Sequence, residues 1–264
     1  MSPTSGIIDL SIWQVAIALV LVLAIVVVSV HQSLGLERDL TIGTIRAIVQ
    51  LYAVGLILAA VFAAAHWYWV LLILGVMTGV ATQAAVSRLS KPLPGATWIA
   101  ASALTISTAV TLAYVIGIVV QVRPWYEPQY IIPIAGMILG NSMTSAALAG
   151  DRLQSDLRSR SDEIEARLAL GFSGREAVQP MVRASLRAAM IPTVNGMMTV
   201  GLVQLPGMMT GQILAGSSPL LAIRYQIVVV FMQGAATALG SLLFVRLAAG
   251  RYLTPAHQLQ RYLL

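Results

Sequence analysis

The chain contains no cysteine, which excludes disulfide bonds and thiolate metal sites. Cysteine usage therefore does not indicate whether the protein lies in an oxidising or a reducing compartment. It has a single lysine, Lys91, and no glycine-rich loop precedes that lysine. A phosphate-binding P-loop requires the pattern G-x-x-x-x-G-K-[ST]. We therefore expect that the chain does not hydrolyse ATP alone by this route and that it binds no cofactor of its own. If ATP drives its work, ATP acts through a partner chain.

Charge is also scarce. Only 10% of the 264 residues are charged, 58% are hydrophobic and the mean hydropathy is +0.84. A soluble domain carries about 25% charged residues, so the composition predicts an integral membrane protein. The net charge of +6 does not indicate nucleic acid, because most basic residues lie in short loops beside apolar runs.

Seven apolar runs approach the roughly 20 residues that a membrane-spanning helix needs. They cover about residues 11–30, 47–65, 70–86, 97–122, 130–149, 191–215 and 221–249. The chain shows no internal repeat and no linker composition. We predict an all-α integral membrane protein with about seven transmembrane helices, forming one permease-like domain over residues 1–264.

The basic residues predict the orientation. Fourteen of the sixteen lie in the loops after spans one, three and five and in the C-terminal tail, and two lie in the other loops. Cytoplasmic loops carry the excess of Arg and Lys. The N-terminus is therefore expected outside and the C-terminus in the cytoplasm, with a long helical cytoplasmic loop between spans five and six.

The apolar runs contain no Asp or Glu. Carriers that relay protons keep carboxylates inside the membrane, so this absence argues against an acid-relay mechanism. Sodium coupling through carbonyl and hydroxyl oxygens stays open.

Residues 150–190 form a charged segment in this otherwise apolar chain. It holds seven of the sixteen basic residues and six of the ten acids. Apolar residues recur in it at helical spacing: Leu153, Leu157, Ile164, Leu168, Val182, Leu186 and Met190. The pattern predicts amphipathic helices at or beyond the membrane surface, with an apolar face that a partner could bind.

This segment contains a signal that ends one helix and a signal that begins the next. Gly171 is placed to end a helix that contains Glu165 and Ala166. Ser173 can cap the next helix, with Glu176 as its capping-box partner. The spacing from Glu165 to Gly171 resembles the EAA motif of the cytoplasmic coupling loop in ABC-importer permeases, although the downstream I-x-L-P of that motif is not reproduced. By this resemblance, the residues that would dock on a partner ATPase are Glu165, Ala166, Gly171, Ser173 and Glu176.

The sixth run is interrupted by Pro206 and Gly207, which predict a kink or an unwound turn and a gating hinge. Polar residues and methionines lie around it: Asn195, Thr199, Gln204, Met208 and Met209. One interpretation is a substrate path with thioethers suited to soft metals. The other is that methionine fills the gaps around a proline kink. The metal, if there is one, is not defined by the sequence.

Polar residues also occur in the fifth and seventh runs. Asn141 follows Gly136 and Gly140, whose spacing permits close helix packing, and it is either a path residue or an interhelical hydrogen-bonding group. Gln226 begins a polar stripe on one face of the seventh run that continues through Gln233, Thr237 and Ser241. That stripe lines either a helix interface or a pore.

A broader resemblance covers spans two to seven. It is carried by residues 46–50, 136–144, 188–193, 199–211 and 223–227, with the run L-P-G-M-M-x-G at 205–211 as its most diagnostic part. These stretches are similar to FetB-type permeases, the membrane subunits of a bacterial ABC system implicated in iron export, with plant relatives in aluminium tolerance. The resemblance implies a separate ATPase, efflux and the bacterial inner membrane. It leaves the cargo open between metals and sugar nucleotides.

The leading hypothesis is a permease subunit of an ABC exporter, acting as a homodimer in membrane lipid with an ABC-type ATPase and without nucleic acid. The expected substrate path comprises Asn141, Asn195, Thr199, Gln204, Met208, Met209 and Gln226. Two alternatives remain: a secondary carrier or channel that needs no ATPase, and a membrane scaffold or sensor that transports nothing.

Overall fold

The computed structural model describes residues 11–64, 66–91, 93–254, 256 and 258–263, and no strand occurs in this part of the chain. The α-helices are α1 (Ile12–His31), α2 (Glu37–Ala64), α3 (Trp67–Val86), α4 (Ala96–Tyr114), α5 (Pro128–Ser159), α6 (Ser161–Ala169), α7 (Gly174–Thr199), α8 (Gly207–Leu214) and α9 (Pro219–Arg251). A π-helical segment, Val115–Val120, extends α4, and a 3-10 turn, Arg261–Leu263, lies near the end. The all-α prediction is confirmed.

Six helices of the described chain are long and apolar enough to cross a membrane: α1, α2, α3, α4 with its π-helical extension, α5 and α9. The sixth apolar run of the sequence is not among them. The count of seven spans and the orientation therefore stay predictions.

The run at 191–215 is a broken helix. α7 ends at Thr199, and α8 begins after its N-cap, Pro206. Between them Gly201 adopts φ +83°, and its N–H donates to the carbonyl of Gln204 at 3.0 Å. Proline has no N–H for a helical hydrogen bond, and glycine tolerates positive φ. The predicted interruption is thus confirmed, as a non-helical loop rather than a simple kink.

Three helices are longer than the apolar runs indicate. α2 begins at Glu37, ten residues before the predicted run at 47–65, and the predicted end at 65 falls outside the described residues. α3 takes in the aromatic residues from Trp67 onward. α5 continues ten residues past Ala149. A helix ends where capping or backbone signals end it, not where its hydropathy falls.

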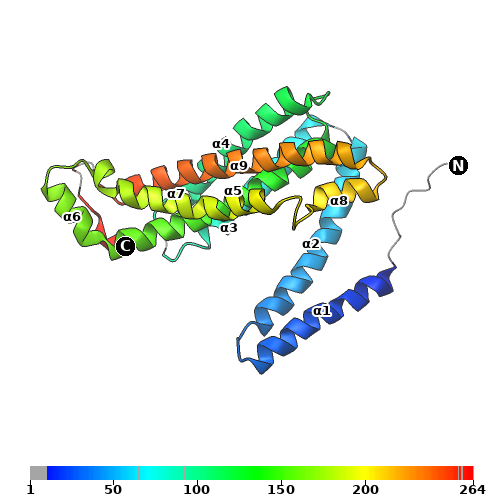
Figure 1. Ribbon diagram of the computed structural model, residues 1–264, viewed down its shortest axis with the longest axis horizontal. Coiled ribbons are helices and arrows are strands. Elements are labelled where there is room, and N and C mark those ends of the chain that lie inside the picture. Colours follow the sequence, from blue (N-terminus) through cyan, green and yellow to red (C-terminus); the bar gives the residue numbers. More distant parts are fainter. Residues whose placement is uncertain (1–10, 65, 92, 255, 257, 264) are drawn as a thin grey trace.

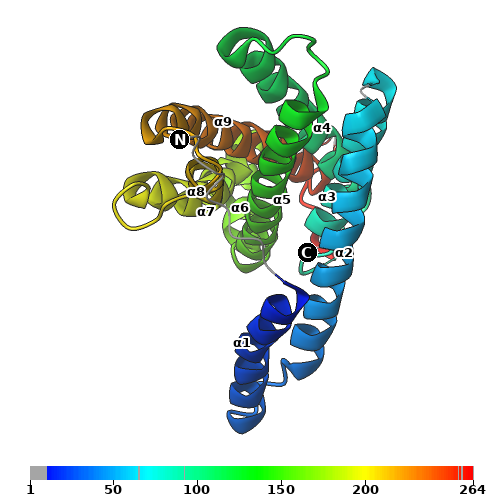
Figure 2. The same cartoon turned by 90° about the vertical axis from the view of Figure 1, so that its right-hand side faces the viewer.

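The helices form a bundle with a separate hairpin. α3, α4, α5, α7 and α9 pack on one another, whereas α1 and the first part of α2 extend away as an antiparallel pair and only the C-terminal end of α2 meets the bundle (Figure 1, Figure 2). Only 6% of the apolar window of α1 or of α2 is buried, against 56% in α5. A helix that is apolar on all sides and unburied suits a lipid surrounding.

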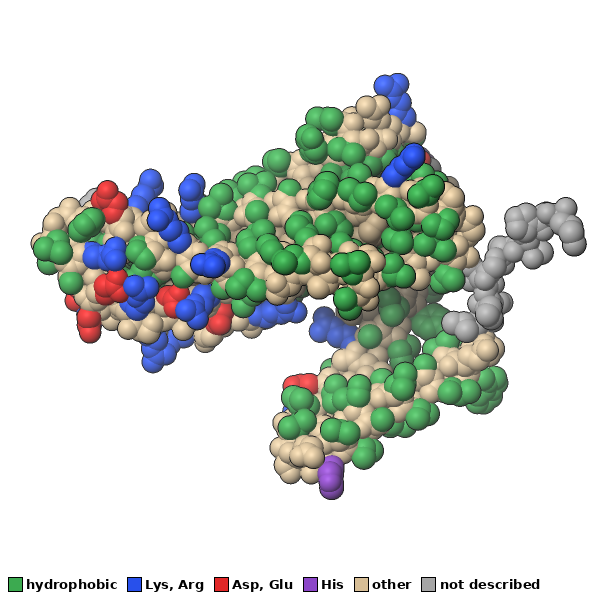
Figure 3. Space-filling model, viewed as in Figure 1, with side chains coloured by type: hydrophobic (Ala, Val, Ile, Leu, Met, Phe, Trp, Pro, Cys, Tyr) green, Lys and Arg blue, Asp and Glu red, His purple; other side chains and the backbone are tan. Residues whose placement is uncertain are grey.

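The charged segment is built on the bundle's own helices. α5 and α7 run side by side toward one end of the bundle, and α6 joins them there (Figure 1). We call residues 150–190 the coupling extension. Figure 3 shows charged side chains gathered at this end, while hydrophobic side chains cover much of the rest.

The apolar face predicted for a partner is used inside the chain. Leu153, Leu157 and Ile164 are fully buried, and they share one core with Met181 and Phe244. The expectation of an open apolar face along these helices was wrong. Helical periodicity identifies the buried stripe, and here α5, α6 and α7 bury their stripes against one another.

Candidate functional site

A cavity of ≈ 420 Å³ lies between α5, α7, the 200–206 loop, α8 and α9. Its volume falls within the range of roughly 300–1,000 Å³ that is typical of ligand pockets. Its lining includes Met137, Asn141, Thr144, Ser145, Pro192, Thr193, Gly196, Met197, Gln204, Pro206, Gly207, Met208, Gln226 and Gln233. We call this space the membrane cavity. The helix break creates one of its walls.

The polar groups of the membrane cavity are neutral. Gln226 is buried, and its Oε1 atom has no hydrogen-bond partner among the described residues. Asn141 donates from Nδ2 to the carbonyl of Met137 at 2.9 Å, which leaves its Oδ1 atom available. A buried amide without a partner is costly unless water or a ligand satisfies it. The cavity therefore suits an occupant that donates hydrogen bonds to these amide oxygens or coordinates them.

Thioethers make up much of the remaining lining. Met137, Met197 and Met208 all line the membrane cavity. Met197 also lies against α9 so closely that a Cβ atom at Gly234 would collide with its methyl group. The three sulfur atoms can coordinate a soft metal, or the three methionine side chains can act as adaptable packing groups. Both interpretations offered by the sequence are compatible with this placement.

The structure brings together four of the seven predicted path residues: Asn141, Gln204, Met208 and Gln226. The predicted hinge, Pro206 and Gly207, lines the same space. The other three path residues lie outside it.

Two of these three are Asn195 and Thr199, which are exposed on α7, where the Thr199 hydroxyl donates to the Asn195 carbonyl at 3.0 Å. The third, Met209, lines a neighbouring apolar cavity with Leu205 and Phe231. The transport roles of all seven stay predictions.

Several cavity residues were not among the predicted path residues. Met137, Thr193 and Met197 line the cavity, and the last two lie only two residues from the predicted Asn195, on the opposite face of α7. The available signal was spacing: Met137 precedes Asn141 by four residues, so both occupy one face of α5.

The polar stripe of α9 divides between two environments. Gln226 and Gln233 line the membrane cavity. Thr237 and Ser241 are fully buried, and their hydroxyl oxygens have no partner in the described part of the chain.

On α5, a Cβ atom at Gly136 would lie 3.2 Å from the methyl carbon of Met77, whereas one at Gly140 would meet nothing within 4 Å. Only the first of these glycines is at a close helix contact.

The coupling extension turns sharply between α6 and α7. Gly171 has φ +90°, its N–H donates to the Leu168 carbonyl at 3.0 Å, and the Phe172 N–H donates to the Arg167 carbonyl at 3.2 Å. These two bonds make the Schellman end that glycine permits. The predicted helix stop at Gly171 is confirmed.

α7 begins with the predicted capping box. The Ser173 side chain accepts from the Glu176 N–H at 3.4 Å, and the Ser173 N–H donates to the Glu176 carboxylate at 2.9 Å. Hydrogen bonds from the Ser173 hydroxyl and N–H lower the pKa of Glu176. The local turn is therefore defined on both sides by its own hydrogen bonds.

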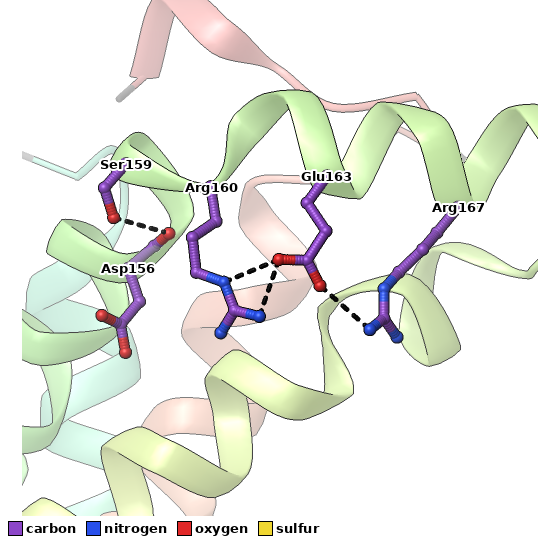
Figure 4. A network of polar contacts seen from close by, with 5 residues as sticks. All are labelled: Asp156, Ser159, Arg160, Glu163 and Arg167. Carbon is purple, nitrogen blue, oxygen red and sulfur yellow. Dashed lines mark hydrogen bonds and ion pairs between the residues drawn. The ribbon is translucent and has the colours of Figure 1, made fainter.

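Ion pairs cluster on α6. Glu163 accepts from Arg160 and Arg167, which lowers the pKa of Glu163, chiefly through the Arg160 hydrogen bond (Figure 4). From the C-terminal tail, Arg261 pairs with Glu165 at 2.5 Å and Asp162 at 2.6 Å. The pairs of Glu163 are local to α6 and its N-cap, whereas those of Arg261 connect the tail to α6.

Two large apolar residues protrude at the tip of the coupling extension. Leu170 is 78% exposed and Phe172 is 47% exposed, one on each side of Gly171. They were not among the predicted docking residues. The sequence signal was their position beside the glycine of a helix stop, within a charged segment.

Comparison with known proteins now identifies the family. The model of the "Uncharacterised protein family (UPF0014)" matches residues 12–253. A UPF0014 membrane protein of Synechocystis is 46% identical over 204 residues, covering 76% of this chain and 78% of the relative. The "Probable iron export permease protein FetB" of Escherichia coli is 36% identical over 246 residues, covering 93% of each chain.

A plant protein is similar over nearly the same length. "Protein ALUMINUM SENSITIVE 3" of Arabidopsis thaliana is 34% identical over 247 residues, covering 94% of this chain and 89% of the relative. No solved structure matches the chain. The apolar helices, the extent of the family match and these relatives lead to one conclusion: the chain belongs to the UPF0014 family of multi-pass membrane proteins, together with FetB-type permeases.

Proposed function

We propose that this protein is the permease subunit of an ABC exporter, acting as a homodimer in the bacterial plasma membrane with a separate ATPase. The name of the Escherichia coli relative, a probable iron export permease, supports an export role. The chain itself catalyses no reaction in this proposal. ATP binds and is hydrolysed on the partner subunit.

The observation that carries the proposal is the continuity of α5 and α7. Both helices line the membrane cavity, and both continue without a break into the coupling extension. Asn141 and Ser159 lie on the same helix, about 27 Å apart at 1.5 Å per residue. Because a packed helix pair moves largely as a rigid unit, displacement of the α6 end would alter the cavity.

The helix break supplies the second requirement of such a mechanism. The loop at 200–206 forms part of the cavity wall, and Pro206 and Gly207 mark its junction with α8. Discontinuous helices are typical of transporter substrate sites, where unwound backbone faces the cavity and not lipid. A shift of α7 would therefore be transmitted to this wall.

A metal ion such as iron is the cargo that we favour. The relative's name supports iron, and the thioethers of Met137, Met197 and Met208 provide donors for a soft or borderline metal. The neutral amides of Asn141 and Gln226 would complete the contacts. In the described chain no group of three or more His, Cys, Asp or Glu side chains gathers into a metal site.

Docking at the tip of the coupling extension provides the first test. The ATPase would be co-expressed with Leu170→Ser/Phe172→Ser, and we expect its co-purification to fall sharply because the exposed apolar contact is lost. Leu34→Ser serves as the control, since Leu34 is 56% exposed on the α1–α2 turn, away from the tip. Gly171→Pro is unsuitable, because proline cannot adopt φ +90° and the turn would unfold.

Unchanged co-purification of the tip variant would contradict docking at this site. ATP-driven efflux of iron from cells or vesicles that hold both subunits tests the exporter role itself. Flux with this chain alone, driven by an ion gradient, would favour a secondary carrier. No flux under any energisation would favour a scaffold or sensor.

A further inference from the structure

A second polar cavity lies outside the membrane cavity, where the α3–α4 connection meets α5. It measures ≈ 420 Å³ and is lined by Ser90, Lys91, Gln154, Ser155, Arg158 and Ser159. None of these residues lines the membrane cavity. We call it the Lys91–Arg158 cleft.

Both cations of the cleft lack a carboxylate partner. Ion pairs in the described chain involve Arg152, Arg160, Arg167 and Arg261. Of the closest acids in sequence, Asp156 pairs with Arg152, while Asp151 accepts from the hydroxyl of Ser90 at the edge of the cleft. The lining itself contains no acid. Two cations that form no ion pair within the described residues therefore face one space beside a single neighbouring carboxylate, and this excess of positive charge favours an anion.

The wall that carries Lys91 is held against α5. The buried Gln154 accepts from the Lys91 N–H at 3.0 Å and donates from Nε2 to the Lys91 carbonyl at 3.3 Å. Gln154 is 4% exposed and also hydrogen-bonds with Tyr252 at the end of α9. This two-way clamp keeps the Lys91 backbone beside Arg158 and reduces the entropy lost when an anion binds.

Hydroxyl donors complete the site. The Ser155 side chain forms no hydrogen bond within the described residues, although it lines the cleft. An ammonium, a guanidinium and a free hydroxyl are the groups that bind phosphate oxygens. Lys supplies a point charge, while Arg can supply two parallel hydrogen bonds.

The level of the cleft indicates where the phosphate comes from. α3 ends at Val86 and α4 begins at Ala96, so the connection that carries Lys91 lies at the boundary between apolar helices and water. Phospholipid headgroups occupy this level, and basic pockets beside membrane helices bind anionic headgroups. We propose that the Lys91–Arg158 cleft binds a phosphate group, supplied by the headgroup of an anionic phospholipid.

The test uses the purified full-length chain in detergent and two phosphate sources. Phosphatidylglycerol, phosphatidylcholine and inorganic phosphate are added separately, and bound lipid is counted by native mass spectrometry beside a thermal-shift measurement. We expect selective retention of phosphatidylglycerol, and roughly tenfold weaker retention in Lys91→Gln/Arg158→Gln, because each basic residue near a headgroup strengthens binding. Both side chains are exposed, so the variant is expected to fold.

Two further variants separate a built site from diffuse charge. Arg183→Gln/Arg187→Gln removes two exposed cations of α7 that form no ion pair within the described residues and lie outside the cleft, so it should retain phosphatidylglycerol like the parent chain. Ser155→Leu fills the cleft without changing its charge and should lose the lipid. Equal loss in the Arg183/Arg187 variant, or full retention in Ser155→Leu, would overturn the proposal.

Inorganic phosphate distinguishes the two sources. Retention that inorganic phosphate cannot displace supports the lipid headgroup. If millimolar inorganic phosphate displaces the lipid, and phosphate binding also depends on Lys91 and Arg158, the cleft is a phosphate site that is occupied by the free anion. If neither source depends on these two residues, the cleft binds no phosphate. This outcome is independent of transport, so it leaves the proposed function to its own test.

Discussion

Arg261, in the C-terminal tail, donates from Nε to the carboxylate of Glu165 on α6, with the two atoms 2.5 Å apart. The two residues are 96 positions apart in sequence. Glu165 is one of the residues expected to contact the ATPase, so the tail already occupies part of the proposed docking surface. These hydrogen bonds to Glu165 and to Asp162 raise the pKa of Arg261.

Removal of this contact should expose the Glu165 carboxylate. In Arg261→Gln we expect stronger retention of the ATPase, because the tail no longer competes for α6, and faster proteolysis of the tail itself. Pull-down with the purified ATPase and limited proteolysis measure the two effects. Arg183→Gln is the matched control. Weaker retention in Arg261→Gln would show that the tail is part of the docking surface and not its competitor.

Low pH should weaken the start of α7. The pKa of Glu176 lies below its ordinary value of 4.5 in the folded chain, so the charged carboxylate stabilises the fold above about pH 4.5. This contribution is lost as the pH falls through the lower, folded-state pKa.

A glutamine at position 176 can still cap the helix but cannot be protonated. The melting temperature of the parent chain should therefore exceed that of Glu176→Gln at pH 7, since a negative charge favours a helix N-terminus. The difference should shrink below pH 4.5. A difference in melting temperature that does not change with pH would show that the Glu176 charge is not its cause.

Two glycines of α5 should respond in opposite ways to alanine. At Gly150, a Cβ atom would lie 2.5 Å from Cε1 of Phe244 and 2.8 Å from Cδ2 of Leu89. We expect Gly150→Ala to destabilise the chain by about 1–3 kcal/mol, as overpacking does. Gly140→Ala meets nothing within 4 Å and should be neutral or stabilising through higher helix propensity. Thermal unfolding in one detergent compares them directly. Equal melting temperatures would contradict the close α5–α9 packing.

The two adjacent methionines of α8 should differ in transport. Met208 lines the membrane cavity, whereas Met209 lines the neighbouring apolar cavity. If thioethers bind the metal, Met208→Leu should reduce ATP-driven metal efflux several-fold, and Met209→Leu should leave it close to normal. The volume of Leu is similar to that of Met, so packing changes little. Equal flux in the two variants would assign both methionines to packing.

Local signals were readable from the sequence because their physics acts within a few residues. Gly171 ends α6 and Ser173 caps α7 with Glu176, as expected, since each motif closes hydrogen bonds between near neighbours. Pro206 and Gly207 likewise predicted the helix break. The absence of charge from long apolar runs indicated the six apolar helices long enough to span a membrane, but the run at 191–215, predicted in the same way, is a broken helix and is not among them.

The tertiary structure decided which other parts of the chain these local features contact. The stripe containing Leu153 and Ile164 was recognisable as one to be buried, but periodicity does not say whether the cover is another protein or the same chain. Successive helical residues point about 100° apart, so Met208 and Met209 separate into two cavities only once α8 is oriented. The contact of Arg261 with Glu165 and the meeting of Lys91 with Arg158 depend on how helices distant in sequence pack. The sequence thus determined the helical class, the stop signal at Gly171, the cap at Ser173 and the apolar character of the long helices, because those depend on local hydrogen bonds and on hydropathy. Packing alone decided which side chains share a cavity, because that depends on the relative positions of whole helices.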